Sequence, residues 1–268
     1  MNRPAVTLNA TSPASLKPAG WGASLLLFGI PAAGCAAAYY VLRPWLEHSG
    51  VSAITSYVGS LSIPLALMFV AALVAYRLEG NPLTWSAFSA RMRFPRPRRK
   101  DALIGLALFV ATAAGYALFS LAASWLIHHG IIPLPANRSI MDDPNAEFSW
   151  ALFDRAAGGR LHGQWGIALL FLAAYFFNIA GEELWWRGTI LPRQELSFGR
   201  HAWIVHGLMW AAFHVYKYWE VLALAPVCLL IAFAAQRLRN NWPGTLVHFL
   251  MNLSGPLIVW IGVIRPPS

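Results

Sequence analysis

Long uncharged stretches constrain the fold of this chain more than any other feature of its sequence. Seven stretches contain no Asp, Glu, Lys or Arg, and they lie at 18–42, 48–76, 102–137, 161–181, 201–216, 221–236 and 240–264. A membrane-spanning helix needs roughly 20 mostly apolar residues, and five of the stretches reach that length. The two 16-residue stretches depend on flanking Lys217, Glu220 and Arg237 extending to the interface. The pattern predicts an all-α, polytopic transmembrane helical bundle with about 7–8 spans.

Composition removes several other classes of protein. Only 12% of the 268 residues are charged and 57% are hydrophobic, which excludes intrinsic disorder. Both cysteines, Cys35 and Cys228, lie in apolar stretches, so neither a disulfide framework nor a cysteine metal cluster is expected. An outer-membrane barrel would show short alternating segments instead of long apolar runs. The net charge of +9 does not indicate nucleic acid binding, because the basic run at 90–101 is short and reads as a solvated loop against anionic headgroups.

Basic residues are distributed unevenly between the two sides of the predicted bundle. With seven spans, 14 Lys and Arg residues flank one side and six flank the other. The positive-inside rule then places the amino terminus and the loop at 77–101 in the cytoplasm and the loop at 128–160 outside. We expect an integral protein of a bacterial inner membrane, since Arg outnumbers Lys as in GC-rich genomes. Residues 1–20 form a polar tail, and 21–264 form a single membrane domain in contact with the lipid bilayer.

Two adjacent glutamates follow the apolar run of the fourth predicted span, residues 163–192. If Pro192 ends this helix, Glu182 lies roughly 13 Å from the inner helix end at 1.5 Å per residue. Glu183 and Arg187 have i, i+4 spacing and can pair on one helix face. Adjacent helical residues point about 100° apart, so Glu182 is the carboxylate left free for chemistry.

Other helices carry polar residues at overlapping depth. His214 lies in the fifth stretch, and His248 and Asn252 lie on one face of the seventh. A single His or Asn within a membrane is more often an interhelical contact than a catalytic group. Buried together, however, these groups all need polar partners, and a shared cavity would supply them.

Three motifs resemble those of the CAAX protease and bacteriocin-processing (CPBP, or Abi) family of intramembrane peptidases. The Glu-Glu-x-x-x-Arg motif appears as Glu182-Glu183-Leu184-Trp185-Trp186-Arg187, Phe-x-x-x-His appears with Trp210 in place of Phe and with His214, and His-x-x-x-Asn appears as His248 and Asn252. The resemblance covers residues 165–255, within a motif-bearing core at 161–264. It implies an endopeptidase that cleaves a membrane-anchored protein or peptide near the cytosolic face. Glu182 and His214 would activate a water, and His248 and Asn252 would stabilise the oxyanion.

The remaining motif residues and the rival mechanisms complete the sequence-based picture. Glu183 and Arg187 are expected to hold the helix end, and Trp210 is expected to affect packing around His214. No cofactor or metal is expected, although Glu182, His214 and His248 could instead bind Zn²⁺ and leave a position for water. A proton-coupled transporter that uses the same buried Glu and His is the alternative from another class. A noncatalytic membrane chaperone is a further one.

Overall fold

A computed structural model describes residues 16–147 and 149–266, and every regular element in these ranges is helical. The predicted all-α helical bundle is therefore confirmed. Residues 1–15 of the predicted polar tail lie outside the described residues. The α-helices are α1 (Trp21–Ala37), α2 (Arg43–His48), α3 (Ala53–Leu78), α4 (Trp85–Arg91), α5 (Arg99–His128), α6 (Trp150–Ala156), α7 (Trp165–Glu182), α8 (Leu191–Phe198), α9 (Ala202–Phe213), α10 (Val221–Leu238), α11 (Trp242–Asn252) and α12 (Ser254–Ile264). Two π-helices, η1 (Ala38–Leu42) and η2 (Glu183–Ile190), and two 3₁₀ turns, η3 (Gly199–His201) and η4 (His214–Lys217), connect some of them.

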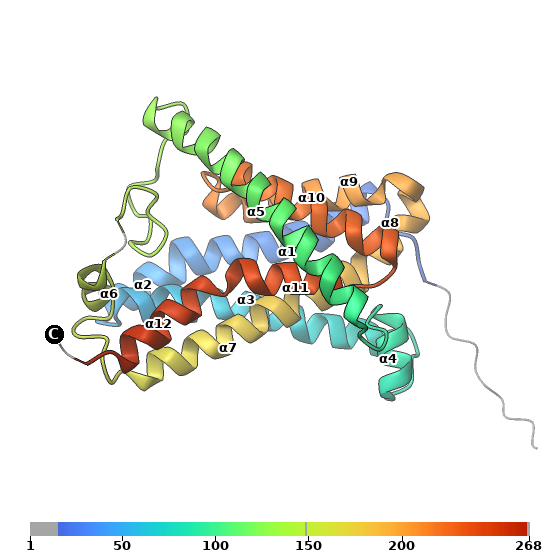
Figure 1. Cartoon of the computed structure of the whole chain (residues 1–268), viewed down its shortest axis with the longest axis horizontal. Helices are drawn as coiled ribbons and strands as arrows, with labels where there is room; N and C mark the ends of the chain where they lie inside the picture. Colours follow the sequence, from blue (N-terminus) through green and yellow to red (C-terminus); the bar gives the residue numbers. More distant parts are fainter. Residues whose placement is uncertain (1–15, 148, 267–268) are drawn as a thin grey trace, which may run out of the picture.

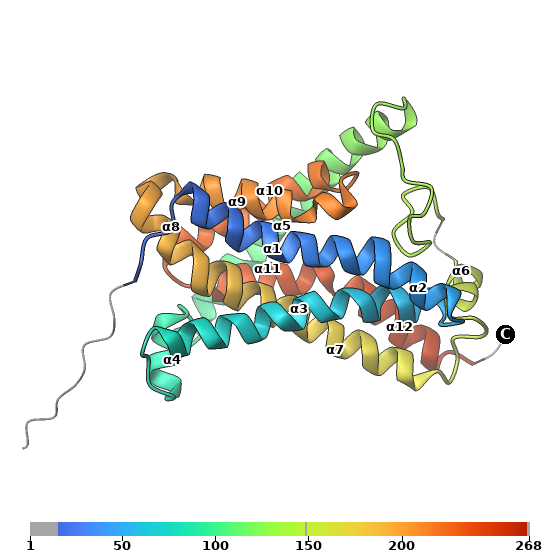
Figure 2. The same ribbon diagram turned by 180° about the vertical axis from the view of Figure 1, so that it is seen from behind.

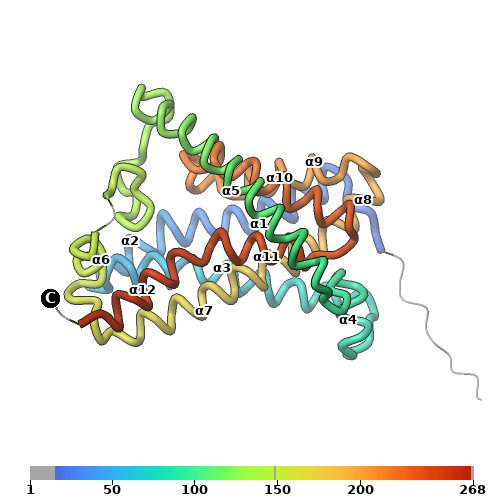
Figure 3. The backbone as a smooth tube through the Cα atoms, in the orientation of Figure 1, coloured from blue at the N-terminus to red at the C-terminus, as the bar shows by residue number. Residues whose placement is uncertain are grey.

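Each of the seven uncharged stretches falls on a helix, and the chain is an integral membrane protein. Five helical stretches in the described residues are long and apolar enough to cross a membrane, or six when α11 and α12 count as one span bent by 44°. One of the five, Trp165–Lys217, contains two of the predicted stretches, and the chain turns back between α8 and α9 within it (Figure 3). Gly199 has φ +54°, a left-handed backbone that glycine adopts without a steric penalty.

The two ends of the bundle carry the loops that the charge pattern separates. The start of α1, α4 and α8 lie at one end of the long axis, whereas α2, α6 and the end of α12 lie at the other (Figures 1 and 2). The turn of the α9–α10 hairpin points toward the end that carries α6 but lies partway along the long axis (Figure 1). Arg187, which the sequence assigned to the first of these ends, is instead fully buried inside the bundle.

The fourth helix does not end at Pro192, so that prediction was wrong. After Glu182 the helix widens into the π-helix η2 and then continues as α8 to Phe198, with Pro192 in the first turn of α8. A proline is tolerated there because first-turn N–H groups of an α-helix have no partner within the helix. Glu182 consequently lies about 24 Å from the end of the helix instead of roughly 13 Å.

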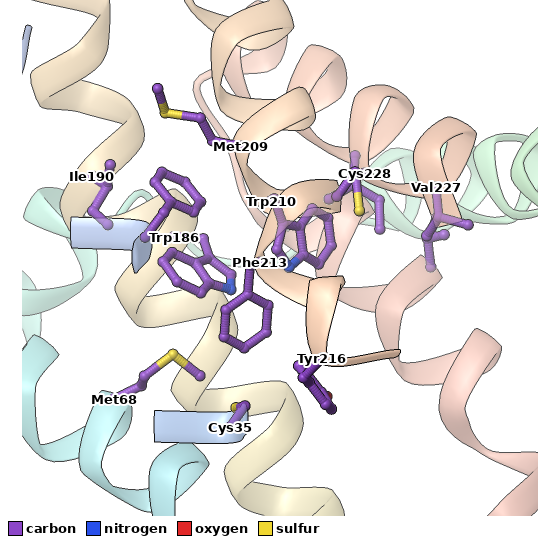
Figure 4. Close-up of a cluster of buried hydrophobic side chains, with 14 of the residues drawn as sticks. Cys35, Met68, Trp186, Ile190, Met209, Trp210, Phe213, Tyr216, Val227 and Cys228 are labelled. Carbon is purple, nitrogen blue, oxygen red and sulfur yellow. The ribbon is translucent and has the colours of Figure 1, made fainter. Parts of the chain in front are cut away.

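The largest hydrophobic cluster surrounds the segment that bears the Glu-Glu motif. Trp186 stacks on Phe28 with ring centroids 4.4 Å apart, and it meets Phe213 edge-on (Figure 4). Close approach of α3 to α7 depends on Gly181, since a Cβ there would lie 2.6 Å from the Leu65 carbonyl oxygen. This packing holds Gly181, the residue before Glu182, directly against Leu65 of α3.

The basic run at 90–101 is only partly solvated, which corrects the sequence interpretation. Arg91 forms an ion pair with Glu79 at 2.6 Å, and Arg93 forms one with Glu195 at 2.6 Å. Their side chains are 12% and 15% exposed. These arginines tie the α4 region to the ends of α3 and α8 instead of facing headgroups.

Candidate active site

Glu182 is a buried carboxylate held by three neutral N–H donors. Its Oε2 accepts hydrogen bonds from Trp186 Nε1 at 3.0 Å and from Trp210 Nε1 at 2.7 Å, and its Oε1 accepts one from Asn178 Nδ2 at 3.1 Å. The residue is only 2% exposed. A carboxylate oxygen has two lone pairs, so Oε1 keeps one available beyond its single protein bond. The side chain is thus fixed in position and retains a proton-accepting site.

His214 begins the 3₁₀ turn η4 at the end of α9. Its Nδ1 lies 2.9 Å from the Trp210 carbonyl oxygen. A carbonyl oxygen can only accept, so Nδ1 carries the proton and donates it. In the neutral ring Nε2 is then an acceptor. This tautomer suits a residue that holds a water by accepting from it.

Glu182, His214 and Asn252 line one cavity of about 210 Å³. Asn178, Lys217 and Glu220 also contribute to its wall. Lys217 Nζ pairs with a Glu220 carboxylate oxygen at 2.8 Å, next to the turn of the α9–α10 hairpin. The structure therefore brings together three of the four predicted catalytic side chains. It also places a charged pair on the cavity wall, toward the end of the bundle that carries α6.

Glu183 points into a separate buried cluster with Arg187 and His248. Arg187 Nε donates to Glu183 Oε2 at 3.0 Å, a second guanidinium nitrogen donates to Glu183 Oε1, and all three residues are less than 5% exposed. His248 Nδ1 lies 2.9 Å from Glu183 Oε1. The i, i+4 pairing of Glu183 and Arg187 matches the sequence prediction, and His248 extends it to α11.

His248 itself is not among the residues that line the Glu182 cavity. Its ring meets the Trp210 ring edge-on, with centroids 5.6 Å apart. Asn252 is exposed, because it is the last residue of α11 before the bend into α12. Its Nδ2 donates to the His248 carbonyl oxygen at 3.1 Å. The His-x-x-x-Asn motif therefore splits, with Asn252 in the cavity and His248 in the Glu183 cluster.

Trp210 connects the two clusters. Its ring lies under the Arg187 guanidinium, with 4.0 Å from Cζ to the ring centroid, while its Nε1 donates to Glu182. The sequence predicted an effect on packing around His214 alone. A phenylalanine at this position has no N–H group, so Trp210 adds a donor to the Glu182 carboxylate.

The side chains of a possible zinc site do not converge. Among residues 16–147 and 149–266, no group of three or more His, Cys, Asp or Glu side chains is arranged to hold a metal ion. His248 bonds to Glu183, away from the cavity that Glu182 and His214 share. The ligand set Glu182, His214 and His248 therefore does not fit a zinc ion in this arrangement.

Sequence reasoning missed two partners of Glu182 that its helical spacing offered. Asn178 and Trp186 lie four residues before and after it, the spacing that stacks side chains on one helix face. The Lys217–Glu220 pair had no such signal, because its link to Glu182 depends on how the hairpin packs against α7.

A second cavity of about 330 Å³ adjoins the first between α3, α7 and the bend from α11 to α12. The two share walls at Tyr57, Leu61, Leu65, Asn178 and Asn252. Tyr175 hydroxyl donates to the Phe249 carbonyl oxygen at 2.6 Å beside it. Because Asn252 and Ser254 are exposed, this route opens to the surface of the bundle.

Fold and cavity together define a polytopic membrane protein with a buried carboxylate and a half-buried imidazole in a polar chamber. Residues 164–254, about a third of the chain, match the family model described as type II CAAX prenyl endopeptidase Rce1-like. This match supports the CAAX protease family that the three motifs predicted, a family of peptidases. Comparison with curated proteins and with solved structures found no match.

Proposed function

We propose that the protein is an intramembrane endopeptidase that hydrolyses a peptide bond of a membrane-anchored protein or peptide with a water activated by Glu182 and His214. The observation that carries the proposal is the shared cavity of Glu182, His214 and Asn252. The peptidase family match at 164–254 supports the reaction class.

In the proposed reaction, Glu182 and His214 position one water. Its proton passes to Glu182 as its oxygen attacks the carbonyl carbon of the scissile bond. General bases of this kind typically contribute about 10²–10⁴-fold in rate. Collapse of the tetrahedral intermediate breaks the C–N bond, and the proton moves from Glu182 to the leaving nitrogen.

The developing oxyanion needs N–H donors that are already in place. Asn252 Nδ2 is the donor that the cavity supports, since its side chain lines the wall. His248 remains a proposed second donor from the family motif. Its Nδ1 lies 2.9 Å from Glu183 Oε1 and 3.3 Å from an Arg187 guanidinium nitrogen. Nε2 can therefore donate when the ring carries both protons, or in the neutral tautomer whose Nδ1 accepts from Arg187. Glu183, Arg187 and Trp210 act as positioning residues.

Proteolysis by the purified protein tests this proposal. Candidate peptides with a membrane anchor are incubated in liposomes with wild type, with Glu182→Ala and with Glu147→Gln, which changes an exposed carboxylate far along the chain. We expect cleavage by wild type and by the Glu147 variant and none by Glu182→Ala. Equal cleavage by all three proteins would exclude Glu182 as the base.

We also infer that the amino-terminal end faces the cytoplasm of a bacterial inner membrane, as the basic asymmetry indicates. Cysteines at Ser86, on α4, and at Asn145, between α5 and α6, test this because both positions are exposed. Ser139 is unsuitable, since it is 1% exposed. In a background without Cys35 and Cys228, an impermeant thiol reagent should label Asn145→Cys in intact cells and Ser86→Cys only after the membrane is opened. The reverse pattern would invert the orientation.

A further inference from the structure

A large apolar groove lies outside the polar cavity, between α3 and α4 on one side and α7, α11 and α12 on the other. Its volume is about 830 Å³. Aromatic side chains form much of its wall, among them Phe69, Phe88, Phe94, Phe176, Trp242 and Trp260. Glu182, His214 and Asn252, which act on the water and the oxyanion in the proposed reaction, line the other cavity.

The groove faces outward, toward the bilayer. Three of its wall residues, Leu172, Phe176 and Leu257, are 50%, 53% and 51% exposed. An exposed apolar surface on a membrane-spanning segment is in contact with lipid hydrocarbon. A concave apolar surface of this size lies within the usual range of ligand pockets, about 300–1,000 Å³.

One end of the groove adjoins unneutralised positive charge. Phe94 and Trp242 form the wall there, with ring centroids 5.0 Å apart, and Trp242 Nε1 donates to the Pro95 carbonyl oxygen at 2.6 Å. The chain continues directly from Pro95 to Arg96 and to the start of α5 at Arg99.

Only part of the basic run is engaged by acidic residues. Arg91, Arg93 and Arg98 pair with Glu79, Glu195 and Asp101. Arg96, Arg99 and Lys100 are exposed, and within residues 16–147 and 149–266 no hydrogen bond or ion pair of their side chains is present. Three cations thus remain on the segment that leads from the groove wall at Phe94 into α5. This segment between α4 and α5 lies at one end of the bundle (Figure 1).

We propose that the groove binds an anionic phospholipid, with an acyl chain along the aromatic walls and the phosphate against Arg96, Arg99 and Lys100. The polarity of the site matches that of the ligand, since a long apolar trough ends in cations at an interface where Trp85 and Trp242 also lie. Anionic headgroups are attracted to such basic clusters near a membrane surface.

Lipid retention and thermal stability in detergent test the proposal. The full-length protein is purified, delipidated and titrated with phosphatidylglycerol or with phosphatidylcholine of the same acyl chains. Native mass spectrometry counts the bound lipid, and the unfolding midpoint is followed in parallel. We expect one phosphatidylglycerol to bind and raise the midpoint, and phosphatidylcholine to do neither at the same concentration.

Two variants address the two halves of the site. Arg96→Gln with Arg99→Gln should weaken phosphatidylglycerol binding about 25-fold, because each cation near an anionic lipid is worth about a fivefold change in affinity. Leu172→Trp with Leu257→Trp should reduce binding by filling the groove.

Matched controls carry the same chemical changes elsewhere. Arg200→Gln with Arg237→Gln removes two exposed cations at the same end of the bundle, and Val41→Trp with Leu67→Trp adds bulk to a different apolar hollow of about 500 Å³. Both should bind phosphatidylglycerol like wild type. Equal binding of the two lipids, or equal losses in site and control variants, would show an unspecific boundary lipid and overturn the proposal. Copurification of a peptide that phosphatidylglycerol cannot displace would also overturn it. Peptidase activity is a separate readout, so failure of one proposal leaves the other testable.

Discussion

Two neighbouring carboxylates have different surroundings, one in the polar cavity and the other beside the apolar groove. Glu182 lines the polar cavity, where it accepts hydrogen bonds from three neutral donors. Glu183 borders the apolar groove, yet its oxygens turn inward to Arg187 and His248. A charge beside hydrocarbon must be paired, whereas a charge in a polar chamber can keep a lone pair for substrate. We infer from this difference that Glu182, the carboxylate without a counter-ion, is the one that can act as a general base.

Replacing Glu182 should produce the largest effect on activity. Glu182→Gln keeps the side-chain volume but removes the proton acceptor, so kcat should fall by about 10²–10⁴-fold. Helix content and the unfolding midpoint should stay near those of wild type. The measurement is the initial rate of peptide cleavage in liposomes, with circular dichroism on the same samples. Retained wild-type rates would contradict the distinction between the two glutamates.

Replacing Glu183 should instead act on stability. Glu183→Gln leaves the buried Arg187 charge without its partner, which typically costs about 3–5 kcal/mol. The matched change Glu195→Gln removes a partner of the partly exposed Arg93 and should cost about 1 kcal/mol or less. Chemical denaturation in micelles measures both. If the two variants lose equal stability, the Glu183 cluster is not the buried ion pair described above.

Asp142, which lies between α5 and α6, should make the stability of the protein depend on pH. Burial raises the pKa of Asp142 to about 6, and the Tyr39 hydroxyl donates to its Oδ1 at 3.0 Å. Because the folded-state pKa lies above the unfolded one, its stabilising effect is complete below about pH 4 and is lost as the pH rises through 6. The loss amounts to no more than about 3 kcal/mol. Unfolding midpoints of wild type should fall between pH 4.5 and 7.5 more than those of Asp142→Asn. Parallel curves would rule out this contribution.

Trp210 offers a finer test of the polar region. Trp210→Phe keeps an aromatic ring for Arg187 but removes the N–H donor to Glu182, and we expect kcat to fall about tenfold, the order of one hydrogen bond to a charged group. Trp219→Phe is the control, since Trp219 is buried and its Nε1 has no hydrogen-bond partner among the described residues. Equal cleavage rates for the two variants would contradict a role of the Trp210 N–H group at Glu182.

The smallest expected effect is that of metal removal. Dialysis against a chelator should leave the cleavage rate unchanged, because Glu182 and His214 suffice to activate water in the proposed reaction. Metal content is determined on the same sample. Stoichiometric zinc, with activity lost on chelation and regained on addition of zinc, would replace the metal-free mechanism.

Local spacing made part of this site predictable from the sequence. The i, i+4 rule gave the Glu183–Arg187 pair, and the uncharged stretches located the helices. The same spacing relates Asn178 and Trp186 to Glu182, but neither side chain is charged, so the sequence did not single them out as its partners. The separation of His248 from Asn252 was not predictable, because it depends on the bend after α11 and on where Trp210 packs. Pro192 misled for a local reason, since a new first turn begins just before it.

Because of the π-helix η2, the number of residues between Glu183 and Pro192 determines how α8 is oriented relative to the two glutamates. A π-helical turn holds one residue more than an α-helical turn over a similar rise, and such widened turns occur often at functional sites. Glu182 therefore ends a regular helix, whereas Arg187 and Gly188 lie in the widened segment. Deleting one residue between 184 and 190 would restore a regular helix and rotate α8 by about 100° relative to the glutamates. The spacing between Glu183 and Pro192 thus aligns two helix faces that an unbroken α-helix would set apart.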